Sequence, residues 1–273
     1  MHMTHKYAST LVVKYGGGAM PLNRPAENDP ILAEIASLRR AGSQVVLVHG
    51  GGPEIDAALA LRGIETARID GLRVTDLASL EVTEAVLCGS INKRIVRDAL
   101  GLGLPAVGVS GQDGNMLVAE RALGKGGANL GYVGTIVATD ARPIRALLDA
   151  GFLPVVAPLA VARDASHALN VNADSAAAAI AAELGADAFV AVTNVPRVLR
   201  DPDDPASGID RFTADEAFAF AAGDACRSSM KPKVTAAAGA VKRGAAAAYI
   251  CAFKTNAIAS ALAGDATIVC ALA

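Results

Sequence analysis

The sequence predicts an α/β protein with a mainly parallel sheet that helices cover on both faces. Short apolar runs bounded by Gly or Pro recur along the chain, and helix-length segments lie between most of them. The composition agrees with this fold class. The chain has 273 residues, of which 52% are hydrophobic, and a formal net charge of -2, which suits one large domain or two lobes that share a sheet.

Seven apolar runs are typical of strands. They span residues 10–15, 44–49, 105–110, 152–158, 188–193, 247–253 and 266–270. Two of the intervening helices have clear end signals. One begins with Asp29 and Pro30 and stops at Gly42, and the other starts at an Asn or Asp near residue 172 and ends at Gly185. In parallel sheets, ligands bind at the carboxyl ends of the strands, and Gly, Lys, Asn and Asp are concentrated there in this chain.

A seam between two lobes is predicted near residues 160–175, where the chain leaves one strand and enters the alanine-rich helix. Residues 200–210 are rich in Pro and Asp, so we expect them to form an exposed excursion. The sequence has no internal repeat of fixed period.

Composition excludes several classes of function. A pI near 6.1 and 4% aromatic residues argue against a nucleic-acid-binding surface. The apolar stretches are too short for a signal peptide or a membrane span, so we expect a cytoplasmic protein. The four cysteines have no CxxC spacing, which favours small buried side chains in a reducing compartment over zinc ligands or disulfides.

The first predicted strand ends in "KYGGG", residues 14–18. Gly16, Gly17 and Gly18 would let backbone N–H groups approach a bound phosphate, with Lys14 within reach as a compact cation. A plain tight turn with a solvent-facing lysine is an equally good interpretation of this motif alone. The motif is not a Walker A loop, and Pro21 rules out GxGxxG.

A second glycine turn, "HGGGP", follows the second strand. Pro53 opens the next helix, so Gly51 and Gly52 would place amide groups at a helix N-terminus, where anions bind. Two strand ends with consecutive glycines favour a shared anion-binding edge over two coincidental turns. His49 is expected to support the turn by hydrogen bonding rather than to act as a base.

Arg73, in "DGLRVTD", precedes a helix that Thr75 or Asp76 would cap. Its planar, always charged guanidinium suits a carboxylate ligand. The competing interpretation is a surface salt bridge.

The segment "LNVNAD" alternates apolar and polar residues, so on an extended chain Asn170, Asn172 and Asp174 would share one side. A helix cap needs only one of them. We therefore expect Asn170 to hold a substrate oxygen and Asp174 to orient lysines.

Lys231 and Lys233 lie at the start of a predicted helix, where the helix dipole disfavours cations. Their placement suggests a polyanionic ligand, although a solvated helix end remains an alternative.

Taken together, ten segments in this order resemble the amino acid kinase family over nearly the whole chain. They are "VVKYGG", "VLVHGGGPEID", "DGLRVTD", "CGSINKRIV", "AVGVSGQDG", "LGYVG", "LPVVAPL", "NVNADSAAAAIA", "VTNVPRVL" and "MKPKV". No single glycine motif is specific, but the ensemble is.

The resemblance implies a three-layer αβα sandwich around a mainly parallel eight-stranded sheet. Residues 1–172 would form an N-terminal lobe for acyl amino acid binding and dimerisation, and residues 173–273 a C-terminal lobe for nucleotide binding. The implied reaction is phosphoryl transfer from ATP, with Mg2+, to the γ-carboxylate of N-acetyl-L-glutamate, in a cytoplasmic homodimer. No metal ligand from the protein is implied.

The resemblance also implies roles for individual residues. Lys14 and Lys233 would neutralise the travelling phosphoryl group, with Asp174 organising both lysines. The remaining implied positions are Gly16, Gly17 and Gly51 for phosphate, Gly51, Gly52, Arg73 and Asn170 for the acyl amino acid, and Thr193, Asn194 and Met230 for the nucleotide.

Departures from the family pattern occur in the nucleotide half, where Asn194, Arg197, Ser228 and Ser229 replace expected residues. Two alternatives therefore stay open. One is a kinase for aminoadipate or glutamate linked to a small acidic carrier protein. Such a kinase would need a basic rim around the substrate site, and Arg62, Arg68, Arg94 and Arg97 are the candidates for it. The other is a silent regulatory homologue, against which the retention of Lys14, Asp174 and Lys233 argues.

Overall fold

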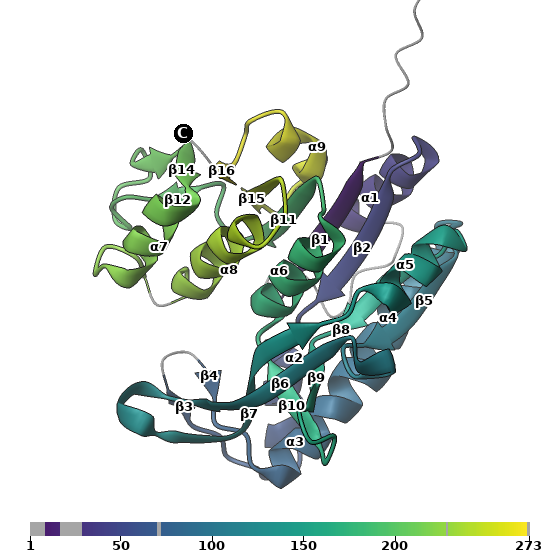
Figure 1. Cartoon of the computed structure of the whole chain (residues 1–273), viewed down its shortest axis with the longest axis vertical. Coiled ribbons are helices and arrows are strands. Elements are labelled where there is room, and N and C mark those ends of the chain that lie inside the picture. The colour runs from purple at the N-terminus through teal and green to yellow at the C-terminus, as the bar shows by residue number, and fades with distance from the viewer. Residues whose placement is uncertain (1–8, 17–28, 70–71, 228, 272–273) are drawn as a thin grey trace, which may run out of the picture.

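The structure is a computed structural model that describes residues 9–16, 29–69, 72–227 and 229–271, and its centre is an eight-stranded sheet (Figure 1). In spatial order the strands are β14 (Arg211–Thr213), β16 (Thr267–Cys270), β15 (Ala247–Ala252), β11 (Ala188–Thr193), β1 (Thr10–Tyr15), β2 (Gln44–His49), β8 (Leu153–Ala157) and β5 (Ala106–Ser110). All neighbours pair in parallel except β15 and β16. The predicted mainly parallel sheet is confirmed.

All seven apolar runs predicted as strands are strands of this sheet, with ends that differ by no more than a residue from the prediction. The eighth strand, β14, was not among them. It has three residues, and Phe212 is the only apolar one, so no hydrophobic run marks it.

The structure describes nine helices within those ranges, and a π-helical segment joins two of them. The helices are α1 (Pro30–Arg40), α2 (Gly52–Ala60), α3 (Leu77–Glu84), α4 (Asn92–Gly101), α5 (Arg142–Asp149), α6 (Ala173–Leu184), α7 (Ala214–Ala222), α8 (Lys231–Lys242) and α9 (Ala257–Leu262). The predicted end signals are confirmed: Asp29 caps α1 by accepting from the amides of Ile31 and Leu32, and Gly185 ends α6 in the left-handed conformation. No helix in the described part of the chain has the length and apolar character needed to cross a membrane.

The helices form two layers with the sheet between them. Alternate residues of β1 belong to different cores: Val12 belongs to the core that includes residues of α5, α6, α7 and α8, whereas Leu11 and Val13 belong to the core that includes residues of α1, α2, α3, α4 and α9. Figure 1 shows α6 and α8 on the near side of the sheet. The expected three-layer αβα sandwich is therefore present.

A second, smaller sheet was not predicted. Its four strands close on themselves in the order β10 (Ala168–Val171), β7 (Asn129–Thr139), β6 (Leu117–Leu123) and β9 (Leu159–Ala162). Two short hairpins complete the strands: β3 (Arg68–Ile69) with β4 (Leu72–Arg73), and β12 (Val198–Leu199) with β13 (Gly208–Ile209). The small sheet places Asn170, and the first hairpin places Arg73. β13 and the residues that connect it to β12 lie in the segment 200–210, which was expected to be an exposed excursion; most of that segment is exposed.

Each half of the chain contributes four strands to the main sheet. Residues 1–172 supply β1, β2, β5 and β8, residues 173–273 supply β11, β14, β15 and β16, and the two halves meet where β1 pairs with β11. Lys14 lies on that junction, opposite Ala191.

Candidate active site

A cavity of about 210 Å³ opens at the carboxyl ends of β1 and β2, where the sequence predicted the site. Its lining comes from β1, the glycine turn after β2, the β3–β4 hairpin, β10 and the start of α6. The polar residues and glycines that line it are Lys14, Gly50, Gly51, Gly52, Arg68, Arg73, Asn170, Asn172 and Asp174.

Lys14 is almost fully buried, with 7% of its surface exposed, and its ammonium group lies 3.0 Å from Oδ1 of Asp174. Gly16 explains how the side chain fits. A Cβ atom built on Gly16 would lie 2.3 Å from Nζ of Lys14. The first glycine of "KYGGG" therefore leaves room for the ammonium group, a role the sequence did not suggest. Gly17 and Gly18 lie outside the described residues.

Asp174 stands in the first turn of α6. Asn172 caps that helix by accepting from the amides of Asp174 and Ser175, at 2.9 and 3.1 Å. The prediction of one extended segment through Asp174 is therefore wrong, because the chain turns into a helix at Ala173. Asn170, Asn172 and Asp174 nevertheless line the same cavity.

Lys233 reaches the same carboxylate from α8. Its Nζ lies 4.0 Å from Oδ2 of Asp174 and donates a hydrogen bond to the carbonyl of Ser229 at 3.0 Å. Burial is the main cause that lowers the pKa of Lys233; Lys14 lowers it further, and Asp174 partly offsets both. The predicted convergence of two lysines on Asp174 is thus present.

Asp174 is the shared partner of both lysines. Its Oδ1 forms the 3.0 Å ion pair with Lys14, and its Oδ2 lies 4.0 Å from Lys233. Two lysines therefore share one buried carboxylate, an arrangement that suits an anionic ligand.

The glycine turn packs directly against the helical layer. A Cβ on Gly51 would lie 2.3 Å from Cδ1 of Ile91 and 2.8 Å from Cδ2 of Leu87, whereas a Cβ on Gly52 would meet no atom within 4 Å. Ile91 and Leu87 belong to a π-helical segment, Ala85–Ile91. Gly51 is the N-cap of α2, so this close packing fixes the amide groups at the positive end of that helix.

His49 supports the turn, as the sequence suggested. It is fully buried; its Nδ1 donates to the carbonyl of Gly50 at 2.9 Å, and its Nε2 accepts from the side-chain amide of Asn92 at 3.3 Å. Asn92 also donates to the carbonyl of Val155, at 2.9 Å. Reasoning from individual residues did not identify Asn92, because an asparagine inside a helix carries no local signal of a buried partner.

The burial of His49 predicts a specific pH dependence of stability. Burial is the main cause that lowers the pKa of His49 to about 4, with Arg94 and Lys93 adding to it and the bond to Gly50 opposing it. The unfolded chain binds a proton near pH 6.5 and the folded chain does not, so the free energy of unfolding falls as pH drops below that value. We expect a loss of about 2 kcal/mol between about pH 7.5 and about pH 5 from this group.

Urea denaturation of the wild type and of His49→Gln at both pH values measures this loss. The variant should lose about 2 kcal/mol less than the wild type on acidification, because all other groups titrate in both proteins. Equal losses in the two proteins would show that His49 is protonated in the folded state.

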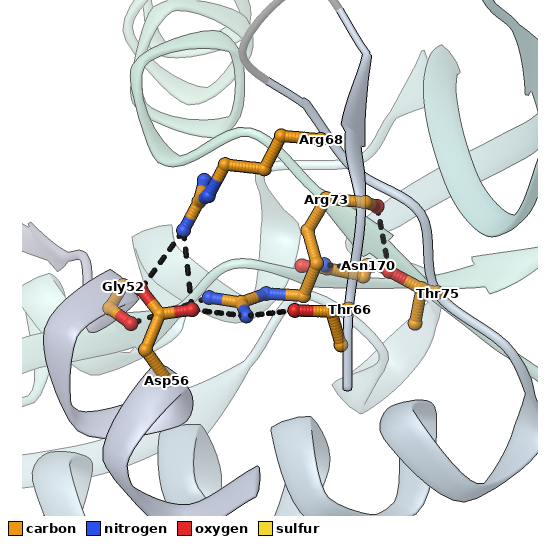
Figure 2. A network of polar contacts seen from close by, with 7 residues as sticks. All are labelled: Gly52, Asp56, Thr66, Arg68, Arg73, Thr75 and Asn170. Carbon is orange, nitrogen blue, oxygen red and sulfur yellow. Dashed lines mark hydrogen bonds and ion pairs between the residues drawn. The ribbon is translucent and has the colours of Figure 1, made fainter. Parts of the chain in front are cut away.

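Arg73 is buried, with 6% of its surface exposed. This burial argues against the alternative interpretation of Arg73 as part of a salt bridge on the surface. Its Nη1 donates to Asp56 and to Oγ1 of Thr66, the latter at 3.3 Å, and its Nη2 donates to the carbonyl of Gly52 at 3.2 Å (Figure 2). Neither Asp56 nor Thr66 was identified from the sequence.

Thr75 connects Arg73 to Asn170. Its Oγ1 donates to the carbonyl of Arg73 at 2.9 Å and accepts a long hydrogen bond from the side-chain amide of Asn170 at 3.5 Å. Figure 2 shows Asn170 beside Arg73. The cap of α3 is Asp76 rather than Thr75, since Asp76 accepts from the amide of Ser79 at 2.8 Å.

Of the three residues expected to bind the nucleotide, all of which the structure describes, only Met230 lines the cavity in the C-terminal half of the chain. This second cavity has a volume of about 190 Å³. Thr193 is buried, and its hydroxyl is engaged with Val195 and Cys251, whereas Asn194 is exposed. Neither Thr193 nor Asn194 lines the second cavity among the described residues.

The start of α8 and the residues just before it contact both sites. Ser229 and Met230 line the second cavity, and the carbonyl of Ser229 accepts from Lys233, which points toward Asp174 in the first. Arg197, one of the departures from the family pattern, also lines the second cavity and pairs with Asp210 and Asp265. Ser228 lies outside the described residues.

Comparison with known proteins finds relatives along most of the chain. The model of the amino acid kinase family matches residues 9–252. Acetylglutamate kinase from Thermosynechococcus vestitus is 41% identical over 241 residues, covering 88% of this chain and 80% of that protein. Acetylglutamate kinase from Symbiobacterium thermophilum is 39% identical, covering 86% and 82%.

A solved structure of N-acetylglutamate synthase from Neisseria gonorrhoeae, complexed with coenzyme A and N-acetyl-glutamate, matches with a TM-score of 0.80 at 26% identity. The match covers 97% of this chain, which spans 60% of that chain's length. From the match over nearly the whole sequence and the identities near 40%, we conclude that the chain belongs to the amino acid kinase family.

Proposed function

We propose that this protein transfers the γ-phosphoryl group of ATP to the γ-carboxylate of N-acetyl-L-glutamate, giving an acyl phosphate on the route to arginine. The observation that carries the proposal is the convergence of Lys14 and Lys233 on Asp174, where Lys14 and Asp174 line the first cavity. The similarity to acetylglutamate kinases over most of the chain supports it.

The chemistry requires no general base, because a carboxylate is already a nucleophile. The main obstacle is repulsion between two anionic reactants that must meet in line. The cavity and its border supply the positive charge that offsets this repulsion: Lys14 lines the cavity, Lys233 lies beside Asp174, and the N-terminus of α2 lies at the glycine turn.

Each residue has a distinct task in this mechanism. Lys14 and Lys233 offset the negative charge that spreads over the phosphoryl oxygens in the transition state. Asp174 keeps the two like-charged lysines close to each other. The amide groups of the turn at Gly51 and Gly52 bind phosphoryl oxygens, and Gly16 leaves space for the Lys14 ammonium.

The donor set suits Mg2+ that is bound mainly by the nucleotide. Within the described ranges, no group of three His, Cys, Asp or Glu side chains could hold a metal ion, and Asp174 is the only carboxylate on the described lining of the first cavity. Mg2+ commonly keeps few protein ligands and binds the phosphates of its substrate, whose charge it neutralises. Asp174 is thus the one carboxylate of the described lining that could contact it.

We also propose how the chain divides its work. Residues 1–172 bind the acyl amino acid and residues 173–273 the nucleotide, with Met230 contacting it, Thr193 bracing the turn at Val195 and Asn194 near the phosphates. The second cavity, beside Ser229 and Met230, supports this division. The proposal includes a cytoplasmic homodimer.

The carrier-protein alternative gains no support from the expected basic rim. Arg68 pairs with Asp56, Arg94 pairs with Glu54, and Arg62 donates to the carbonyl of Ala58 in the preceding helix, α2. These contacts offset the charge of Arg68 and Arg94 and engage Arg62, whereas the fourth candidate, Arg97, is exposed.

Trapping the acyl phosphate with hydroxylamine tests the proposed function. With ATP and Mg2+, we expect hydroxamate from N-acetylglutamate, and product at least about tenfold more slowly from N-acetylaminoadipate, because one methylene in a fitted pocket changes specificity by that order. Free glutamate and acetylaspartate should give less. If no acceptor yields product while calorimetry still detects N-acetylglutamate binding, the silent regulatory homologue is the better description.

A further inference from the structure

Asp56 lies between two arginines at the edge of the first cavity. Its carboxylate accepts from Nη1 of Arg73, and from Nη2 of Arg68 at 2.9 and 3.3 Å (Figure 2). Both arginines line the cavity. We propose that Asp56 is a positioning residue that holds Arg73 so that one edge of its guanidinium is ready for the substrate carboxylate; this rests on the proposed function.

The hydrogen bonds of Arg73 leave a defined edge available. Asp56 and Thr66 occupy Nη1, and the carbonyl of Gly52 takes one N–H of Nη2. The Nε–H donates to none of the described residues. Nε and Nη2 lie on the same side of a guanidinium and together form the parallel pair of donors that binds a carboxylate.

Asp56 and Gly52 fix Arg73 to one rigid element. They are four residues apart on α2, so they lie one turn apart on the same face of that helix. The guanidinium therefore spans the first turn of the helix whose N-terminus carries the glycine turn. Because both groups would be held by the same helix, the distance between a carboxylate bound to Arg73 and a phosphoryl group bound at the glycine turn would stay constant. Phosphoryl transfer requires such fixed positions.

The charge of Asp56 suits it to hold Arg73. Burial alone would raise the pKa of Asp56, but the hydrogen bonds and charges of Arg73 and Arg68 outweigh it and lower the pKa below its usual value. Asp56 is therefore ionised at neutral pH, and an ionised acceptor holds a guanidinium more strongly than a neutral one.

A different role for Asp56 makes the opposite prediction. If its carboxylate occupied Arg73 in place of the substrate, removing it would free Arg73 and tighten binding. If Asp56 positions Arg73, removing it lets the guanidinium turn away, and binding weakens. The sign of the change in affinity separates the two roles.

The test is calorimetric binding of N-acetylglutamate to Asp56→Ala, together with steady-state kinetics. We expect Kd and KM for N-acetylglutamate to rise roughly tenfold, the effect of one charge-assisted hydrogen bond. The kcat and the KM for ATP should change little. Asp56→Asn keeps an oxygen acceptor without the charge; since neutral hydrogen bonds are about half as strong, we expect a rise of about threefold.

Glu120→Ala is the matched control. Glu120 is also a half-exposed acid paired with an arginine, Arg163, at 2.9 Å, but it lies outside the first cavity. Its removal should leave binding and kinetics unchanged, which separates the loss of a surface ion pair from the loss of a positioned guanidinium.

A double variant tests whether Asp56 acts through Arg73. In an Arg73→Ala background, Asp56→Ala should cause no further loss of affinity, because the group it positions is already gone. Tighter or unchanged binding in Asp56→Ala, or an additional tenfold loss in the double variant, would overturn the proposal. If the wild type itself fails to bind N-acetylglutamate, the proposed function falls and this inference with it; a binding wild type with an unaffected Asp56→Ala overturns the positioning role alone.

Discussion

Replacing Lys14 by Ala is expected to lower kcat about a hundredfold or more while the protein stays folded. One preorganised donor to a developing oxyanion is worth on the order of 3 kcal/mol. The ammonium of Lys14 is buried, lies 3.0 Å from Asp174 and faces the cavity, so water cannot replace it well. Lys233 remains near Asp174 in the variant, which limits the damage from an unpaired buried carboxylate.

The hydroxamate assay under saturating substrates measures this change, and thermal unfolding reports the fold. Lys233→Ala should show a similar loss for the same reason. Lys242→Ala is the control, because Lys242 is a solvent-accessible lysine of the same helix, α8, that pairs with Asp215. Near-wild-type turnover in Lys14→Ala or Lys233→Ala would remove that lysine from the mechanism.

Gly131→Ala is expected to cause the largest loss of stability, roughly 3 kcal/mol, from left-handed backbone strain together with overpacking. Gly131 lies in β7 with φ at +71°, and a Cβ there would lie 2.1 Å from the carbonyl oxygen of Thr75. That oxygen cannot simply move away, because it accepts from the amide of Tyr132 at 2.7 Å. The shift would also disturb Arg73, whose carbonyl Thr75 binds.

Urea denaturation measures the free energy of unfolding, and Gly126→Ala provides a matched control. Gly126 has nearly the same φ, +68°, but a Cβ there would meet no atom within 4 Å. This variant should lose only the strain part, about 1 kcal/mol. Equal losses in the two variants would show that the close approach of Gly131 to Thr75 does not limit stability.

The sequence alone predicted the structure correctly where a short segment carries its own signal, such as an apolar run or a capping residue. Seven of the eight strands of the main sheet are short apolar runs, as buried parallel strands commonly are, and the ends of α1 and α6 carry their own capping residues. The meeting of Lys14 with Asp174 was also predictable, because strand ends and helix starts share one edge of such a sheet.

The sequence was insufficient where partners are distant and the pattern is mixed. In β6, residues such as Glu120 and Arg121 interrupt the apolar positions, and its pairing with β7 has two register shifts, so no clean alternation marks the strand. The link from Asp56 to Arg73 depends on how a hairpin lies against a helix, which no motif records. For the same reason, Asn92 behind His49 could not be foreseen.

The space above Gly16 also has an evolutionary consequence. The atom that a Cβ would strike is the mobile end of a lysine side chain rather than backbone, so the protein could fold with alanine at this position but would push its ammonium away from Asp174. Selection on this glycine therefore acts mainly through turnover, because Lys233 would still lie near Asp174. A descendant that abandoned catalysis could exchange Gly16 at little cost, whereas exchanging Gly131 would still lower its stability.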